Sequence, residues 1–280
     1  MWLPWKYAAI FAVVFGITGF ILRNKPKPWV ATAAVLNETS LMLVLYGLWR
    51  LAGTLSVMKV THAMDRGRWL WRVERWLPLP SELRVQRWFL PYPHVMRLFN
   101  HYYRLVHVPA LGVLLLWLFF RHRQHYKPWR NAIAWLTGLS LAIQLIPVAP
   151  PRMFPGPPPG LGFVDAGAVF GPTVYGRLGT GAADQLSAMP SVHIGWAVII
   201  AAIAICVSKS KWRWLVLLHP LMTFVVVVAT ANHWWLDGLV EIAMLVVIVG
   251  VQHFVRRLIA RMRPSMSTSI EDFARESVSV

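Results

Sequence analysis

The sequence predicts an all-α integral membrane protein that crosses the bilayer several times and carries an additional interfacial amphipathic helix. Hydrophobic residues fill 57% of the 280 positions and charged residues only 14%, too few to coat a soluble globule of this size. The apolar residues are gathered in long runs. Sixteen tryptophans, often near the ends of these runs, fit aromatic belts at the two membrane interfaces.

Seven apolar segments each approach the length needed to cross ~30 Å of hydrocarbon. The first has no basic region before it and no small-residue cleavage site after it, so it predicts an extra N-terminal transmembrane anchor helix within residues 1–28. Residues 29–260 form the membrane-embedded domain, and the polar tail at 261–280 is expected to be disordered. The segments are 5–22, 29–58, 99–120, 129–148, 190–207, 212–231 and 234–257.

The net charge of +17 comes mostly from short basic tracts beside the apolar runs, which favours anionic lipid headgroups over nucleic acid as partners. Tracts at 23–27, 121–130, 209–213 and 256–263 alternate with segments poor in lysine and arginine, so we expect them, and the tail, to be cytoplasmic. The loop at 149–189 and the turn near residue 232 then share the outer face. The lone cysteine, Cys206, excludes an intrachain disulfide.

Residues 61–98 conflict with this orientation, because the same count places them outside although they carry seven arginines. Part of the region is strongly amphipathic, which predicts an interfacial helix. Either it is a spacer whose arginines contact headgroups, or it guides an anionic lipid substrate. On a helical wheel one arc holds Arg68, Arg72 and Arg75, and the opposite arc holds Trp69, Leu70, Val73, Trp76 and Leu77.

The outer loop at 149–189 begins within the proline-rich stretch "PVAPPRMFPGPPPG" of residues 147–160. It has 41 residues without an evident element, which is long for a simple connector. It is either a linker or the roof of a site, with Arg152 at its start.

The stretch "AMPSVHIGWA" at 188–197 opens an apolar helix with polar residues. Pro190 suits a first helical turn, and the free amides around Ser191 to His193 would favour an anion. An ionisable residue near a membrane helix is costly, so His193 is a candidate functional residue.

The later stretch "ANHWWLDGLVE" places His233 and Asp237 at i and i+4, on one face of a helix. If Asp237 accepts the Nδ1 hydrogen of His233, Nε2 is left unprotonated and nucleophilic. Two histidines and a carboxylate beside an anion site predict phosphoryl transfer.

"PSVH" at 190–193 and "HWWLD" at 233–237 resemble two signature motifs of the type 2 phosphatidic acid phosphatase superfamily. "PVAPPRM" with "AMPSVHIGWA" is similar to the branch that contains inositol phosphorylceramide synthase and its bacterial relatives. The resemblance implies a six-helix core and a phosphohistidine mechanism without cofactor or metal. It assigns attack on phosphorus to His233, leaving-group protonation to His193, orientation of His233 to Asp237 and phosphate binding to Arg152.

The chain departs from the phosphatase pattern of that superfamily. Leu145 replaces a lysine, Met153 a proline and Val192 a glycine, while Val226 and Val227 replace a serine-arginine pair. Two phosphate-binding cations are therefore absent. The loss favours transfer to a hydroxyl acceptor over hydrolysis.

Other polar residues are candidates for binding. Arg177, together with Ser191 and the helix amides, can replace some of the missing positive charge. His101 and Arg104 lie in a helical stripe with Arg97 and Val108, flanked by Asn100 and His107. The stripe is either a headgroup contact or a substrate pocket for acceptor or phosphate. The acids Glu38 and Glu241 fit helix packing better than catalysis.

Two alternatives are a lipid transporter or flippase and a non-catalytic scaffold. No internal repeat supports a transporter, and no metal motif such as H-E-x-x-H supports metal catalysis. The sequence therefore predicts a metal-independent lipid phosphotransferase or phosphatase. Its substrate would be a lipid phosphate or phosphodiester, with inositol or another polyol as candidate acceptor. It would be a multi-pass protein of a bacterial cell membrane with an extracytoplasmic site.

Overall fold

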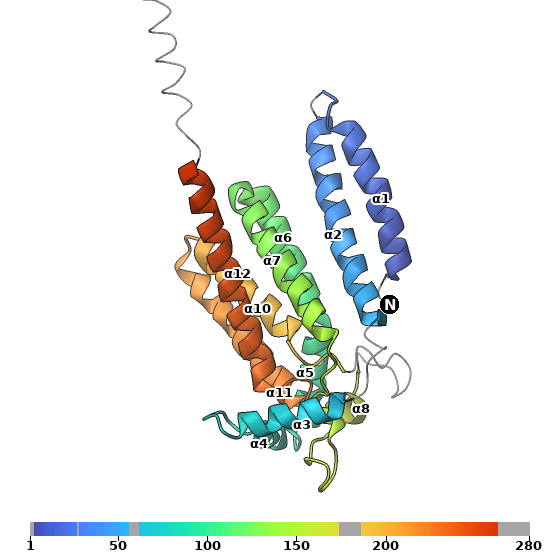
Figure 1. Cartoon of the computed structure of the whole chain (residues 1–280), viewed down its shortest axis with the longest axis vertical. Coiled ribbons are helices and arrows are strands. Elements are labelled where there is room, and N and C mark those ends of the chain that lie inside the picture. The colour runs from blue at the N-terminus through green and yellow to red at the C-terminus, as the bar shows by residue number, and fades with distance from the viewer. Residues whose placement is uncertain (1–2, 27, 56–61, 174–185, 263–280) are drawn as a thin grey trace, which may run out of the picture.

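The computed structural model describes residues 3–26, 28–55, 62–173 and 186–262. The regular elements among these residues are all helices, and the only β-type pairing among them is two isolated bridges. This confirms the predicted all-α class. Long helices run alongside one another in Figure 1. They are α1 (Trp5–Leu22), α2 (Trp29–Leu55), α5 (Pro93–Leu105), α6 (His107–Arg121), α7 (Arg123–Gln144), α10 (Val192–Val207), α11 (Leu218–Ala229) and α12 (Trp235–Met262).

Every one of the seven apolar segments contains helix, but the helices are not equivalent. In the described part of the chain, four are long and apolar enough to cross a membrane alone: α1, α2, α12, and α11 together with the 3₁₀ turn η3 (Lys211–Leu217). The bent pair α5 and α6 makes a fifth. The 16 residues of α10 span about 24 Å, short of the hydrocarbon thickness. The prediction of seven full-length crossings is therefore not confirmed for α10. It is not confirmed for α7 either, because this helix is long enough but not apolar enough.

The predicted crossing at 99–120 is two helices that meet at 45°. Pro109 stands in the first turn of α6. It has no N–H to donate to the carbonyl of Leu105, and its ring crowds that carbonyl, so a straight helix through this point is disfavoured. The bend turns α5 toward the end of the bundle that carries the short helices.

The two ends of the bundle differ. In Figure 1 the α1–α2 turn, the α6–α7 junction and the C-terminal end of α12 lie at the upper end. The short helices α3 (Ala63–Glu74), α4 (Glu82–Phe89) and α8 (Ala166–Phe170) lie at the lower end. The basic tracts near 23–25, 121–123 and 256–261 are therefore at the end opposite the arginine-rich region.

The interfacial region contains two helices, α3 and α4, where the sequence analysis identified one. Leu70 is buried, whereas Trp69 and Trp76 on the same apolar arc are 57% and 89% exposed. The region is fixed to the start of α12: the Leu236 amide donates to Glu74 at 2.7 Å and the Trp235 indole donates to the Pro80 carbonyl at 2.7 Å.

The outer loop is more structured than expected, because it contains the 3₁₀ turn η2 (Pro151–Met153) and α8. Its first half wraps around the fully buried Trp234, whose indole donates to the Ala149 carbonyl at 3.0 Å and packs against Phe154 and Phe163. The backbone of Val148 pairs with the segment that precedes α10, since its amide donates to the Leu186 carbonyl at 2.7 Å.

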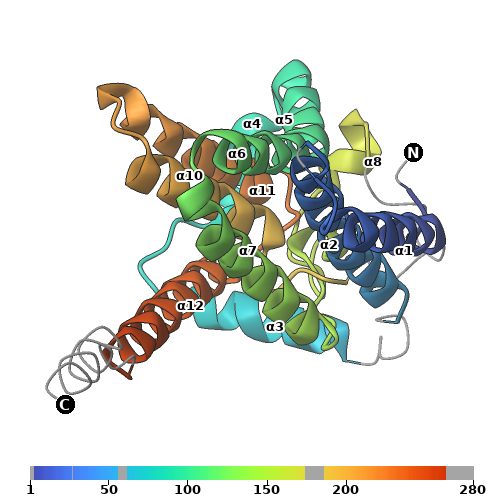
Figure 2. The same cartoon turned by 90° about the horizontal axis from the view of Figure 1, so that it is seen from above.

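The first two helices form a pair at the edge of the bundle (Figure 2). The α1 helix packs along α2, and Ser40 of α2 donates to the Ala12 carbonyl at 2.6 Å. The α2 helix meets α7 through Glu38, whose two carboxylate oxygens accept from Nη1 of Arg130 at 2.7 and 2.6 Å. Glu38 thus has the packing role that the sequence favoured.

Candidate active site

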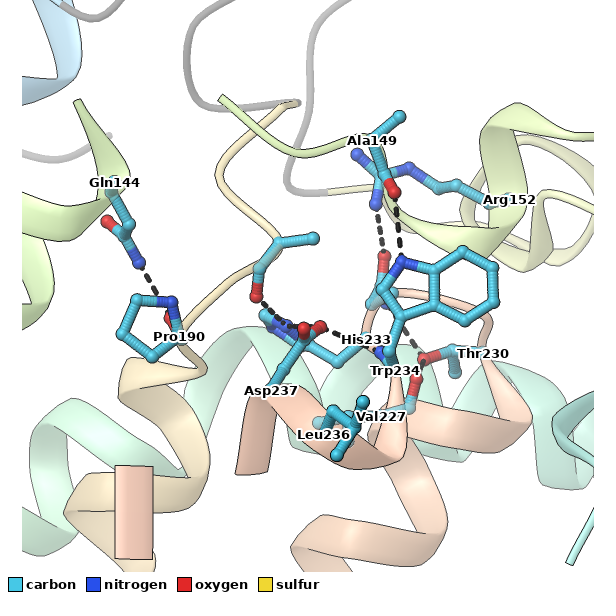
Figure 3. A network of polar contacts seen from close by, with 12 residues as sticks. Gln144, Ala149, Arg152, Pro190, Val227, Thr230, His233, Trp234, Leu236 and Asp237 are labelled. Atoms are coloured by element: carbon cyan, nitrogen blue, oxygen red, sulfur yellow. Dashed lines mark hydrogen bonds and ion pairs between the residues drawn. The ribbon is translucent and has the colours of Figure 1, made fainter. Parts of the chain in front are cut away.

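The three sequence motifs converge in space, and Figure 3 draws one labelled residue from each of them: Arg152, Pro190 and His233. Arg152 lies on η2, His193 lies in the first turn of α10, and His233 lies in the short turn between α11 and α12. The turn is tied to η2, because the Arg152 amide donates to the Ala231 carbonyl at 2.9 Å and its Nη1 donates to the Asn232 side chain at 3.0 Å. The guanidinium is thus held beside the residue that precedes His233.

The protonation of His233 follows from its neighbours. Its Nδ1 lies 2.7 Å from the Ala188 carbonyl oxygen and 3.3 Å from Oδ2 of Asp237. A carbonyl oxygen can only accept, so Nδ1 carries the ring hydrogen and Nε2 keeps its lone pair in the neutral ring. Burial and, to a smaller extent, the nearby charge of Arg152 lower the pKa of His233 to about 4, although the hydrogen bond to Ala188 raises it. At neutral pH His233 is an uncharged base.

Asp237 holds the turn as well as the ring. It is the third residue of α12, and its Oδ2 accepts the Trp234 amide at 2.7 Å, the reciprocal half of a capping box. Its contact with His233 is longer than that of Ala188. Orientation of His233, expected from Asp237 alone, is therefore shared with a backbone carbonyl of the segment that leads into His193.

His193 is enclosed by aromatic rings. Its ring centroid is 4.3 Å from Tyr103, 5.0 Å from His107 in an edge-on arrangement, and 5.9 Å from His233. Such packing restricts the rotamer of His193. The two histidines of the motifs therefore lie as near neighbours from different helices.

The start of α10 differs in detail from expectation. The helix begins at Val192 with Ser191 as its N-cap, so Pro190 precedes the first turn. Ser191 does not offer a free amide, because its N–H donates to the Asp237 carbonyl at 3.1 Å. Its hydroxyl is fully buried and has no hydrogen-bond partner among the described residues. Gln144 of α7 fixes the segment by donating to the Pro190 carbonyl at 2.9 Å.

The remaining predicted residues are Arg177, His101 and Arg104. Arg177 lies outside the described residues. His101 and Arg104 are exposed, whereas Tyr103 and His107, from the same region of sequence, are buried at the site. The helical stripe chosen from the sequence is thus the outer side of α5. The signal for the inner side was the apolar spacing of Met96, Phe99 and Tyr103.

The residues that depart from the phosphatase pattern have ordinary packing roles. Val226 and Val227 are fully buried in α11, and the Val227 carbonyl accepts the amides of Asn232 and His233 at 2.9 and 3.3 Å. Leu145 is half exposed at the end of α7. Among the described residues, Arg152 is a charged side chain whose charge lowers the pKa of His233.

Glu241 lies one turn beyond Asp237 and is fully buried. The Ser140 hydroxyl oxygen lies 2.8 and 3.0 Å from the two oxygens of its carboxylate, a contact that joins α12 to α7. A Cβ at Gly195 would come within 2.4 Å of its carboxylate, so the glycine makes room for this packing. Glu241 has the helix-packing role that its sequence position favoured.

Comparison with known families identifies a superfamily for this chain. A family model described as PAP2 superfamily matches residues 68–251, more than half of the chain, and includes Arg152, His193 and His233. The match begins within α3 and leaves α1 and α2 outside. Neither the curated proteins nor the solved structures contain a match to the chain. The chain belongs to the PAP2 superfamily, whose members are generally phosphatase-type enzymes.

Proposed function

We propose that this protein is a membrane lipid phosphotransferase or phosphatase that works through a phosphohistidine at His233. The observation that carries the proposal is the fixed tautomer of His233. Ala188 and Asp237 hold the hydrogen on Nδ1, so Nε2 is the nucleophilic atom, and Arg152 and His193 lie beside it. Membership of the superfamily supports action on lipid phosphates.

In the first step Nε2 of His233 attacks phosphorus, an N–P bond forms and the bond from phosphorus to the leaving oxygen breaks. The negative charge of the bound phosphate favours the protonated ring of His193, which donates its proton to that oxygen. Arg152 contacts the phosphoryl oxygens and offsets their charge. In the second step water or an alcohol gives its proton back to His193 and attacks phosphorus, and the N–P bond breaks. Protons balance over the cycle.

The acceptor is proposed to be an alcohol such as inositol. The absence of the usual motif cations at Leu145 and Val227 supports transfer, as does the likeness of "PVAPPRM" and "AMPSVHIGWA" to the inositol phosphorylceramide synthase branch. Since attack and protonation are assigned to side chains of this chain, we propose that no divalent metal is required. The site is proposed to face the extracytoplasmic side of a bacterial cell membrane, opposite the basic tracts.

The decisive experiment is product analysis of the purified, detergent-solubilised protein. Phosphatidic acid, a phospholipid diester and a phosphosphingolipid would each be supplied as donor, with EDTA present, with and without inositol. Transfer predicts a new inositol phosphoester whose amount rises with inositol: inositol phosphate when the lipid alcohol leaves phosphatidic acid, and a phosphoinositol lipid when a diester loses its headgroup alcohol. Hydrolysis predicts products without inositol in both cases. His233→Ala should abolish turnover, and wild type quenched at alkaline pH in detergent should carry acid-labile phosphorus on His233. Near-normal turnover of His233→Ala would overturn the mechanism.

A further inference from the structure

The third ring of the site belongs to Tyr103, which lies outside all three motifs. Its hydroxyl is 3.4 Å from Nε2 of His233, and its ring packs against His193 with the centroids 4.3 Å apart and the planes tilted by 32°. Tyr103 is 3% exposed, so its hydroxyl lies in the interior of the site. It is therefore in contact with both the proposed nucleophile and the proposed acid.

The direction of the hydrogen bond is determined by His233. Because Ala188 holds the ring hydrogen on Nδ1, Nε2 can only accept, and the Tyr103 hydroxyl must donate. The phenol hydrogen thus points at the lone pair that attacks phosphorus. When a phosphoryl group approaches Nε2, this hydrogen has to leave the lone pair, and the nearest acceptors are then the oxygens on phosphorus.

The helix that carries Tyr103 is fixed to the site. Asn100, one turn earlier, donates to the carbonyls of Ala166 and Gly171 at 2.9 and 3.1 Å, which ties α5 to the loop that follows Arg152. On the other side, His107 donates to or accepts from Thr223 of α11 at 3.2 Å and packs edge-on against His193. Tyr103 is therefore presented by a backbone held from two directions.

From this geometry we infer that Tyr103 is a catalytic residue: it covers Nε2 of His233 in the free enzyme and donates its hydrogen bond to a phosphoryl oxygen in the transition state. The inference rests on the proposed function. A neutral donor at this position adds to the stabilisation of charge on phosphorus that the guanidinium of Arg152 supplies. It also keeps the nucleophile shielded from water until substrate arrives.

The test is Tyr103→Phe, which keeps the ring on His193 and removes only the hydroxyl. The control is Tyr102→Phe, the neighbouring tyrosine, whose hydroxyl faces His219 at 2.7 Å and Thr223 at 3.1 Å. We expect Tyr103→Phe to lower kcat by about 10- to 100-fold with little change in KM, the scale of one hydrogen bond to a charged group. Tyr102→Phe should keep kcat within about threefold, because its hydroxyl does not touch the nucleophile.

A second readout does not need turnover. Orthovanadate, which forms five-coordinate adducts resembling the phosphoryl transition state, should raise the Tm of wild type more than that of Tyr103→Phe. Inorganic phosphate should shift both equally. Wild-type kcat and wild-type vanadate stabilisation in Tyr103→Phe would overturn the assignment while leaving the phosphohistidine mechanism intact. Failure of the wild type to transfer phosphorus from any donor would instead overturn the proposed function.

Discussion

The Nδ1 hydrogen of His233 is directed at the carbonyl oxygen of Ala188, 2.7 Å away and 45 residues earlier in the chain. The segment that delivers His193 therefore also fixes the tautomer of His233. Displacement of the 188–193 segment would disturb both histidines at once. The positions of His193 and His233 are therefore linked, although the two residues come from separate motifs.

The buried His233 predicts an unusual acid limb in the pH profile. Its pKa is lowered from the ordinary 6.5 to about 4, so the neutral, nucleophilic ring persists as pH falls through 6 and is lost only near 4. With a phosphodiester donor, whose charge is constant in this range, kcat/KM should hold to about pH 5. A pH titration of single-turnover rates measures this, and an acid limb near 6.5 would mean that His233 is solvated.

His193 is expected to act as the acid for the leaving group. His193→Ala should lower the rate with a natural lipid donor by roughly 10²- to 10⁴-fold. A nitrophenyl phosphate ester departs without protonation, so its hydrolysis should fall far less. Parallel rate measurements on the two donors test the role, and equal losses on both would argue against it.

Arg152 is expected to need its guanidinium and not only its charge. Its Nη1 is already engaged with Asn232, so the fork can keep that contact and still bind phosphate, which a lysine ammonium cannot do. Arg152→Lys should lower kcat/KM by about 10- to 100-fold. Arg72→Lys, on the exposed side of α3, is the matched control and should retain activity. Unchanged kinetics of Arg152→Lys would show that another group holds the phosphate.

The sequence predicted the components of this site better than their contacts. Arg152, His193 and His233 were identified because each stands in a motif, and helices occupy all the apolar segments. Tyr103 was missed because the prediction followed the polar stripe with His101 and Arg104, which is the exposed side of α5, and not the apolar spacing of Met96, Phe99 and Tyr103 on the buried side. Only the bend at Pro109 and the packing on α11 decide which face turns inward.

The backbone groups that hydrogen-bond to the site could not be predicted from the sequence either. Any residue supplies a carbonyl, so neither the Ala188 contact to His233 nor the Val227 contacts to the turn leave a trace in residue identity. The same holds for Glu74, which lies in an amphipathic helix and gives no sign that it reaches α12. Contacts of this kind depend on tertiary structure alone.

Glu74 predicts a pH-dependent stability. It is fully buried beside Glu82, and burial together with that neighbour raises its pKa from 4.5 to about 10. Glu82 is paired with Arg75, and Asp237 also faces Glu74. The folded state therefore keeps a proton that the unfolded state releases above pH 4.5, so stability is lost as pH rises toward 10.

Glu74→Gln should flatten this dependence, because the amide cannot ionise and its oxygen can still accept the Leu236 N–H. Between pH 5 and pH 9 the Tm of wild type in detergent should fall more than that of the variant. Asp65→Asn, an exposed carboxylate of the same helix, should follow wild type. Parallel Tm curves for Glu74→Gln and wild type would mean that Glu74 is ionised in the folded protein.

The last prediction concerns which side of the membrane holds the site. The arginines of residues 61–98 argue for the cytoplasmic side. However, α3 is bonded to the start of α12, so this region and His233 share one end of the bundle, opposite the basic tracts near 23, 121 and 256. An interfacial helix can override a statistical charge bias, so we expect the arginine-rich end to be extracytoplasmic.

Single cysteines in a Cys206→Ser background test this arrangement in intact cells with an impermeant thiol reagent. Suitable exposed positions are Arg72 on α3 and Ala168 on α8 for the site end, and Arg23 and Lys127 for the other end. Gly160 is unsuitable, because a Cβ there would collide with the Pro155 carbonyl. Positions 72 and 168 should react from outside, and positions 23 and 127 only after permeabilisation. The reverse pattern would place the site in the cytoplasm, and different behaviour of 72 and 168 would contradict the packing of α3 and the outer loop at one end.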